Sequence, residues 1–232
     1  MISFVIPVLN EGDELAQRLI NLRAAFPASE IVMVDGGSHD ASVAHGICHA
    51  DVVLQGPCGR ARQMNLGAQA ASGPWLCFLH ADTIPEFRDA DLMRQLTAEP
   101  GWGFCQVKLS GRSSLLPIVS WFMNRRSRFT SVATGDQMLV IHRRLFDEHQ
   151  GFADIPLMED VELCKRLRRL VPPRVLPLRV QSSGRRWDQE GALRTIVLMW
   201  TLRLAYWLGC SPSLLWSRYY GGKPSSLTQA SP

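Results

Sequence analysis

Short apolar segments alternate with amphipathic segments over residues 2–98, and this alternation constrains the fold more than any other feature. The short segments are expected to be strands, and the longer ones, with apolar residues on one face, helices. Alternation of this kind predicts parallel βαβ units with right-handed crossovers. The expected strands are Ile2–Val8, Glu30–Val34, Asp51–Leu54 and Trp75–Leu79, and the expected helices are Asn10–Phe26, Asp40–His49, Gly59–Ala71 and Phe87–Ala98.

The second half of the chain is less regular. Its expected elements are strands at Gly103–Leu109, Gln137–His142 and Arg174–Val180 and helices at Met158–Leu170 and Glu190–Leu208, with a stretch rich in Leu, Trp and Arg over residues 115–129. No internal repeat or linker divides the 232 residues. One domain is therefore expected over 1–232, with a flexible tail at 222–232.

Composition indicates an ordinary globular enzyme, with 46% hydrophobic and 20% charged residues and a mild formal charge of +4. The arginines are clustered, which suits either phosphate binding or a solvated helix face. Six scattered cysteines without a CxxC pair favour a reduced, cytosolic protein over a disulfide scaffold or a zinc module. The chain enters its first strand at once, so no signal peptide is expected.

Two expected strands end in acidic segments, Asp35–Asp40 and His80–Asp82. Ligands of open α/β sheets bind beyond the carboxyl ends of the strands. Asp35 directly ends a buried strand and therefore needs a partner, whereas Asp40 is expected to cap the next helix. Asp82 suits a divalent cation that bridges a diphosphate, while His80 alone is expected to be hydrogen-bonded in a turn. Together the two strand ends predict a nucleotide site.

Two helix starts add to this site. Asn10 and Glu11 open the first expected helix, where they either cap it or line a pocket beside Asp35. Arg60 and Arg62 stand in the first turn of another helix, where cations oppose the macrodipole. A bound phosphate would resolve that conflict, and a salt bridge would do so equally well.

The second half contributes two further polar segments. Glu159 and Asp160 open a helix and favour its dipole, and a catalytic role would require one of them to take a proton from an acceptor hydroxyl. Arg185, Arg186 and Trp187 follow a strand, where they either bind diphosphate or stack on the surface.

In chain order, these segments resemble the inverting glycosyltransferases of family 2, which have the GT-A fold. The segments that carry the resemblance are Ile6–Gly12, Asp35–Asp40, Gly59–Ala68, His80–Thr83, Glu159–Asp160 and Arg185–Trp187. The resemblance implies an α/β, Rossmann-like, mostly parallel sheet flanked by helices, with a long C-terminal helix. Residues 1–110 would bind the nucleotide sugar, and 111–221 would form the acceptor side. Residues 135–137 and 158–162 also look like a small bacterial subgroup linked to arsenosugar biosynthesis.

The resemblance also implies a role for each matching residue. Pro7, Asn10 and Glu11 would line the nucleotide pocket, and Asp35 would contact the base or ribose. Arg62 would approach the phosphates, and Asp82 would hold Mg²⁺ or Mn²⁺. Asp160, with Glu159 beside it, would be the general base, and Arg186 and Trp187 would complete the donor site. Processive members carry Gln-x-x-Arg-Trp at this last position. Ser183 replaces the glutamine here, which argues against processive synthesis.

The expected function is therefore transfer of a sugar, of the hexosyl type, from a nucleotide-diphosphate donor to the hydroxyl group of a small-molecule or lipid acceptor. The expected reaction is metal-dependent and inverting, and no nucleic-acid partner is expected. One alternative is a nucleotidyltransferase, which shares a similar sheet. Another is a nucleotide-sugar-binding or membrane-docking protein without catalysis, favoured by His80 in place of the first aspartate of D-x-D.

The final helix, Glu190–Leu208, has apolar residues at helical spacing, interrupted by Arg194, Thr201 and Arg203. A membrane span is not expected, because a span needs about 20 apolar residues. Packing against the domain or a second subunit is favoured over a position in a membrane interface. The predicted location is cytoplasmic, with contact to the inner face of the membrane as the alternative.

Overall fold

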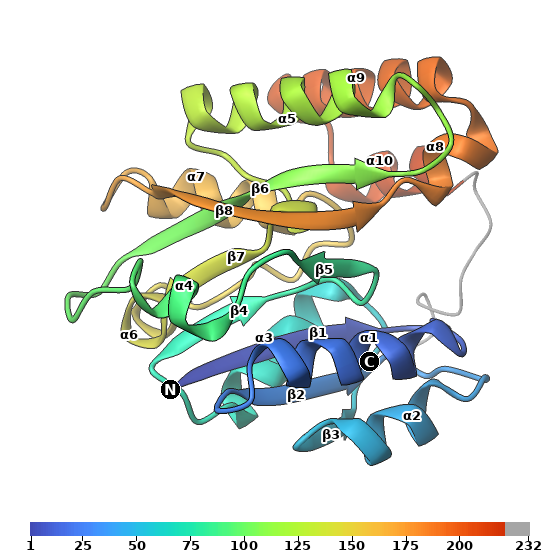
Figure 1. Cartoon of the computed structure of the whole chain (residues 1–232). Coiled ribbons are helices and arrows are strands. Elements are labelled where there is room, and N and C mark those ends of the chain that lie inside the picture. Colours follow the sequence, from blue (N-terminus) through green and yellow to red (C-terminus); the bar gives the residue numbers. More distant parts are fainter. Residues whose placement is uncertain (221–232) are drawn as a thin grey trace, which may run out of the picture.

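The computed structural model describes residues 1–220, including the backbone but not the side chain of Arg186. Over these residues the chain forms an eight-stranded sheet in the order β3-β2-β1-β4-β7-β6-β8-β5 (Figure 1). The strands are β1 Ile2–Val8, β2 Glu30–Asp35, β3 Val52–Gln55, β4 Trp75–Phe78, β5 Thr83–Pro85, β6 Trp102–Ser110, β7 Leu139–His142 and β8 Arg174–Ser183. The predicted tail, 222–232, lies outside the described residues.

The sheet is mostly parallel, as predicted. Strand β1 pairs in parallel with β2 and β4, β2 with β3, and β6 with β8. Strand β7 runs antiparallel between β4 and β6, and β5 runs antiparallel to β8. Strand β7 therefore joins the parallel first half of the sheet to the second half.

Helices cover both faces of the sheet. Phe4 and Ile6 of β1 pack in one apolar cluster with Leu15 of the first helix, and Val5 packs in another with Met64. Burial on both faces explains why these strands are continuous apolar runs. The helices are α1 Glu14–Ala25, α2 Ser42–His49, α3 Arg60–Ala70, α4 Asp89–Met93, α5 Leu116–Thr130, α6 Arg143–Glu148, α7 Glu159–Leu167, α8 Arg185–Glu190, α9 Ala192–Trp207 and α10 Pro212–Tyr219.

Several predicted elements needed correction. The Leu-, Trp- and Arg-rich stretch is the long helix α5, and β5, α6 and α10 were not expected. Helix α1 begins at Glu14 rather than Asn10, and α4 is much shorter than predicted. Gly191, with φ of 86°, separates α8 from the long C-terminal helix α9. A positive φ of this kind suits glycine and interrupts a helix.

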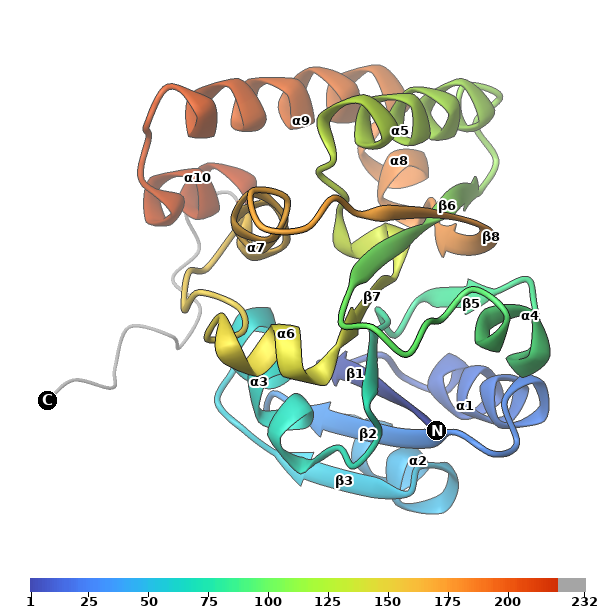
Figure 2. The same cartoon turned by 90° about the vertical axis from the view of Figure 1, so that its left-hand side faces the viewer.

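The C-terminal helices pack onto the part of the molecule that carries the predicted catalytic residues. Met158 and Val161 of the α7 region form an apolar cluster with Leu202 of α9 and Leu215 of α10. Figure 2 shows α9 above α10, with α7 beside α10. Within residues 1–220, no helix has the length and apolar character needed to cross a membrane.

Candidate active site

A cleft of about 780 Å³ opens at the carboxyl end of β1, against the N-termini of α3 and α7. This is the edge of an α/β sheet where ligands are expected to bind. Its walls include three predicted donor-binding residues and one predicted catalytic residue, namely Pro7, Glu11, Arg62 and Glu159. Trp216 of α10 and Tyr220, which follows this helix, also line the cleft, a contact that the sequence did not predict.

Hydrogen bonds join the loop after β1 to the loop after β2. The amide of Asn10 donates to Ser38 Oγ at 2.9 Å, and Asn10 Oδ1 accepts from the amide of His39 at 2.9 Å. Asp40 accepts from the amide of Gly12 at 2.8 Å and from the amide of Ser42, the first residue of α2, at 3.0 Å. The N-cap position of α2 is Ala41, so Asp40 lies one residue before the position predicted for it. Asn10 itself caps no helix: its φ of 52° places it in the left-handed region, which asparagine tolerates. These bonds fix the floor of the site.

Asp35 is buried, with 1% of its surface exposed, at the end of β2. Its carboxylate accepts from the amides of Gly37 at 2.9 Å and Ser38 at 3.0 Å, so its partners lie in its own turn. Gln63 of α3 donates to the carbonyl oxygens that end β1 and β2, at 2.9 and 2.8 Å. In this arrangement Asp35 stabilises the loop that frames the cleft, and its contact with a nucleoside stays a prediction.

Glu11 and Asp82 form an acidic pair beside the cleft. Burial and then the neighbouring Asp82 raise the pKa of Glu11, although three arginines act in the opposite direction. Asp82 is half-buried, and the hydroxyl of Thr83 donates to it at 3.3 Å. The neighbouring Asp82 carboxylate contributes to the raised pKa of Glu11, so a positive charge between the two groups would be stabilising.

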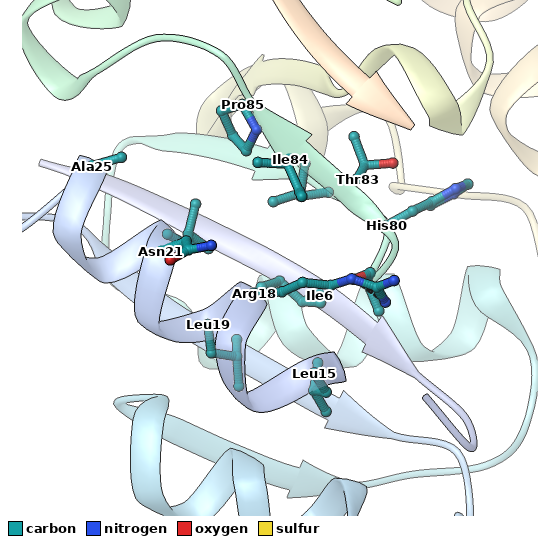
Figure 3. Close-up of a pocket in the computed structure, with 13 residues that line it drawn as sticks. Ile6, Leu15, Arg18, Leu19, Asn21, Ala25, His80, Thr83, Ile84 and Pro85 are labelled. Atoms are coloured by element: carbon teal, nitrogen blue, oxygen red, sulfur yellow. Dashed lines mark hydrogen bonds between the residues drawn. The ribbon is translucent and has the colours of Figure 1, made fainter. Parts of the chain in front are cut away.

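Arg18 of α1 contacts Glu11 and the residue before Asp82. Its guanidinium lies 3.4 Å from Glu11 and donates to the carbonyl oxygen of Ala81 at 3.2 Å, so it ties both strand ends to α1. Figure 3 shows Arg18 in a small pocket of about 80 Å³ between α1 and the segment that carries His80. Sequence reasoning missed Arg18, although its spacing of seven residues from Glu11, two turns of a helix, was a usable signal.

The donor set fits a divalent cation shared with a ligand. Within the described residues, no group of three His, Cys, Asp or Glu side chains has the arrangement to hold a metal ion. Magnesium is commonly held by one or two carboxylates together with substrate phosphates and water. Asp82, with Glu11 beside it, matches that pattern, so the residues present suit a metal that arrives with a diphosphate.

The short 3₁₀ turn Gly135–Gln137, between α5 and β7, places Asp136 against His80. The two side chains lie 3.7 Å apart (Nδ1 to Oδ1), and Ser182 donates to the same carboxylate oxygen at 3.2 Å. Burial would raise the pKa of Asp136, but the hydrogen bond and charge of His80 help to lower it overall. A Cβ on Gly135 would lie only 2.1 Å from His80 Nε2, so this close approach requires glycine.

Glu159 and Asp160 are adjacent in the first turn of α7. Glu159 is 5% exposed, and burial followed by the charge of Asp160 raises its pKa to about 7. Burial also raises the pKa of Asp160, whose two oxygens accept from the amides of Gly135 at 2.8 Å and Val161 at 2.7 Å. A carboxylate with a raised pKa is a stronger base, which is what general base catalysis at neutral pH needs.

The two arginines of the first α3 turn point to different partners. Arg62 is exposed and forms an ion pair with Asp154 at 2.8 Å on the rim of the cleft. Desolvation alone would lower the pKa of the Arg60 guanidinium, but its neighbours Tyr220, Glu159 and Asp136 raise it overall. Arg60 is thus the cation of this helix that lies among the predicted catalytic carboxylates.

Arg126 of α5 approaches the same carboxylates from another side. Burial lowers the pKa of its guanidinium, and Asp160 and then Asp136 oppose that shift. Its buried Nε atom has no hydrogen-bond partner among the described residues. A buried donor of this kind is costly unless a ligand satisfies it. The sequence shows that Arg126 belongs to a cluster of arginines. Because it predicts no helix there, it does not indicate that Arg126 is the arginine that faces inward.

The predicted Arg-Trp pair lies in α8. Trp187 is half-buried and packs against the main apolar cluster, and the side chain of Arg186 lies outside the described part of the chain. The charge of Arg185 reaches the cleft, since it lowers the pKa of Glu11 against the effect of burial. A donor-binding role for Arg186 and Trp187 stays a prediction.

Comparison with solved structures identifies the fold as that of GT-A glycosyltransferases. A mannosyltransferase from Pyrobaculum calidifontis, PcManGT, in complex with GDP-Man and Mn²⁺, matches with a TM-score of 0.58 and 16% identity, over 78% of this chain and 56% of its own. TarS (residues 1–349) from S. aureus in complex with UDP matches with a TM-score of 0.57 and 15% identity, over 78% and 60%. A mycobacterial protein matches with a TM-score of 0.56 and 16% identity, over 79% and 65%. The chain thus spans less than two thirds of each neighbour.

In sequence, residues 3–105 match the model of glycosyl transferase family 2. This region, somewhat less than half of the chain, runs from β1 into β6 and contains the Glu11–Asp82 pair and both α3 arginines. A sequence search of curated proteins found no match.

Proposed function

We propose that this chain transfers a sugar from a nucleotide-diphosphate donor to the hydroxyl group of an acceptor. One observation carries the proposal: Glu11, Arg60 and Glu159 line one cleft at a sheet edge of a GT-A fold, with Asp82 near Glu11 and Asp160 next to Glu159. The region that matches the family 2 model and the nucleotide ligands of the structural neighbours support the same activity.

The proposed reaction follows from the charges in the cleft. Asp160 accepts the proton of the acceptor hydroxyl, and the hydroxyl oxygen bonds to the anomeric carbon of the donor sugar. The bond from that carbon to the diphosphate breaks, and its electron pair leaves with the nucleoside diphosphate. Attack from the face opposite the leaving group inverts the anomeric centre. Arg60 neutralises charge that develops on the diphosphate, which is the largest electrostatic demand of the step.

A divalent cation, Mg²⁺ or Mn²⁺, would be held by Asp82 with Glu11 beside it. Bound there, it would supply a Lewis acid for the departing diphosphate. The Mn²⁺ bound to PcManGT supports this assignment.

The finer predictions belong to the same proposal. The donor sugar is a hexose, synthesis is non-processive because Ser183 replaces the glutamine of processive enzymes, and the acceptor is a small molecule or a lipid. The narrower resemblance to the arsenosugar subgroup remains a prediction about the acceptor.

The proposal is tested with a panel of nucleotide sugars, measured for Mn²⁺-dependent binding and hydrolysis with wild type and Asp82→Ala. The wild type should bind at least one donor more tightly with Mn²⁺ than without it. Asp82→Ala should lose that metal-dependent gain, by roughly 10²-fold or more, because a bound metal contributes several kcal/mol.

Glu99→Gln is the matched control, since Glu99 is exposed and does not line the cleft. It should behave as wild type. Failure of every donor to bind would refute sugar transfer, and binding without hydrolysis or transfer to any acceptor would favour a binding protein. An Asp82→Ala protein with unchanged Mn²⁺ dependence would remove Asp82 from the metal site.

A further inference from the structure

Helices α5 and α9 form a layer with an unusually apolar outer surface. Both views place these helices at the top of the molecule, above β6 and β8 (Figure 1, Figure 2). Each helix buries one face and exposes a stripe of large apolar side chains at helical spacing. The exposed residues are Ile118, Trp121, Phe122 and Phe129 on α5 and Leu193, Val197, Trp200, Leu204 and Trp207 on α9, each more than half exposed. We call this surface the α5–α9 face.

Large exposed apolar side chains gathered along two helices are typical of a site of association. The inner faces of both helices pack against the domain. Val119 of α5 belongs to the main apolar cluster, and Ile196 of α9 packs against it. Leu202 of α9 packs with residues of the α7 region and α10. The outward stripes are therefore not needed to hold the domain together. The prediction that α9 packs against the domain is right for its inner face only.

The charge of the α5–α9 face selects among possible partners. All charged residues of α5, α9 and the adjoining α10 are arginines, and apart from Arg126, which faces inward near Asp160 and Asp136, they are Arg125, Arg128, Arg194, Arg203 and Arg218. Arg125 stacks over Trp121 at 5.8 Å and over Phe129 at 5.0 Å, which keeps its charge among the exposed aromatic rings. A second copy of the chain would bring arginines against arginines. An anionic surface would be complementary.

We infer that the α5–α9 face docks on an anionic lipid surface. Tryptophan and phenylalanine beside arginine are the residues favoured where a helix lies at the boundary between headgroups and acyl chains. Because no helix of residues 1–220 is suited to cross a bilayer, the face would lie on the membrane and not in it. Tryptophan burial would supply the apolar part of binding, and the arginines would supply attraction to anionic headgroups.

The position of the face relative to the cleft gives docking a consequence. A groove of about 1030 Å³ runs between α9 and α10, lined by Glu190, Leu193, Arg194, Val197, Arg218 and Tyr220. Leu193 and Val197 also belong to the α5–α9 face, and Tyr220 also lines the donor cleft. A docked protein would thus hold a continuous path from the bilayer surface to the cleft.

Docking is tested by flotation of the full chain with vesicles of phosphatidylcholine alone or mixed with phosphatidylglycerol. Wild type should float with the mixed vesicles, bind the neutral ones much less, and release as salt is raised. The triple variant Trp121→Gln/Trp200→Gln/Trp207→Gln should bind about tenfold more weakly or worse. Arg125→Gln/Arg128→Gln should weaken binding at low salt and flatten its salt dependence.

Two controls carry exposed residues of the same types elsewhere, Ile47→Gln on α2 and Arg144→Gln on α6, and both should bind as wild type. Unchanged thermal unfolding and nucleotide-sugar binding would show that the variants fold. Wild type that stays unbound, equal binding to neutral and anionic vesicles, or full binding by the tryptophan variant would each overturn the inference. A dimer that the tryptophan variant abolishes would assign the face to a second copy instead. Vesicle binding does not depend on sugar transfer, so the two proposals fail independently.

Discussion

The two halves of the sheet satisfy their polar groups in different ways. In the first half, Asn10, Asp35 and Asp40 are held by backbone amides of the loops that follow β1 and β2. In the second half, Asp160 also accepts from two backbone amides, but it lies close to Glu159 and Asp136, and burial raises its pKa. The first half resembles a rigid frame, and the second holds groups whose protonation is easily changed.

This difference implies that donor binding and chemistry are separable. The bonds of Asn10, Asp35 and Asp40 fix the position of the loops after β1 and β2, which suits a site that must bind the same nucleotide repeatedly. Crowded carboxylates with raised pKa values suit proton transfer. Variants in the second half should therefore damage turnover more than donor binding, and variants at the cations between the halves should damage both.

The largest effect is expected for Asp160→Asn. Asparagine keeps an oxygen that can accept an amide hydrogen bond but cannot take up the proton of the acceptor hydroxyl. We expect kcat to fall by about 10²–10⁴-fold while donor affinity stays within about twofold of wild type. Transfer assays and nucleotide titrations measure the two quantities separately.

Glu162→Gln is the matched control, because Glu162 lies on the same helix and pairs with Arg166 outside the cleft. It should retain wild-type turnover. Normal transfer by Asp160→Asn would remove Asp160 from the base role. A loss of donor binding equal to the loss of turnover would break the proposed separation of the two halves.

A smaller effect is expected at the junction of the halves, where Arg60 and Arg62 serve as controls for each other. Arg62 is already paired with Asp154 on the rim, whereas Arg60 lies among Glu159 and Asp136. We expect Arg60→Gln to weaken donor binding by about 10–100-fold, the range of a charge-assisted hydrogen bond, and Arg62→Gln by only a few-fold. Isothermal titration with a nucleoside diphosphate compares them directly.

The reverse order would return the phosphate-binding role to Arg62, as the resemblance to family 2 implies. Equal and small losses would mean that neither arginine reaches the diphosphate and would leave Arg126, Arg185 and Arg186 as the remaining candidates.

The first half of the chain was largely predictable because its strands are buried on both faces and end abruptly in Gly and Asp. Strands β1 to β4 and the placement of Glu11 near Asp82 follow from that pattern and from the rule that strand ends meet at one edge. The expected choice of Arg62 over Arg60 had no such basis. Residues two apart on a helix point about 200° apart, and the sequence does not say which one faces the cleft.

The second half was harder to predict for two reasons. The apolar pattern of one helix is obscured by exposed apolar residues, and other features depend on contacts between distant segments. Helix α5 has buried apolar residues, Leu116 and Val119, beside exposed ones, Trp121 and Phe122, so its helical period is obscured. The antiparallel insertion of β7 and the approach of Asp136 to His80 join segments far apart in the chain. Neither leaves a local pattern that propensity or spacing detects.

The smallest effect concerns the raised pKa of Glu159 in the second half. It tests whether this pKa makes the stability of the protein depend on pH. Folding raises this pKa from 4.5 to about 7, so the native state holds a proton that the unfolded state has lost over that interval. Wild-type stability should therefore fall as pH rises from about 4.5 to 7 and level off above. Glu159→Gln removes this penalty and should be more stable than wild type by about 1–2 kcal/mol at pH 8, with a smaller advantage at pH 5. Urea unfolding at both pH values measures the difference.

Glu148→Gln is the control, because Arg144 instead lowers the pKa of that exposed carboxylate, so the gain at high pH should be missing. A Glu159→Gln advantage that does not grow with pH would show that Glu159 is ionised in the native state throughout, and the contrast in protonation between the two halves would then rest on Asp160 alone.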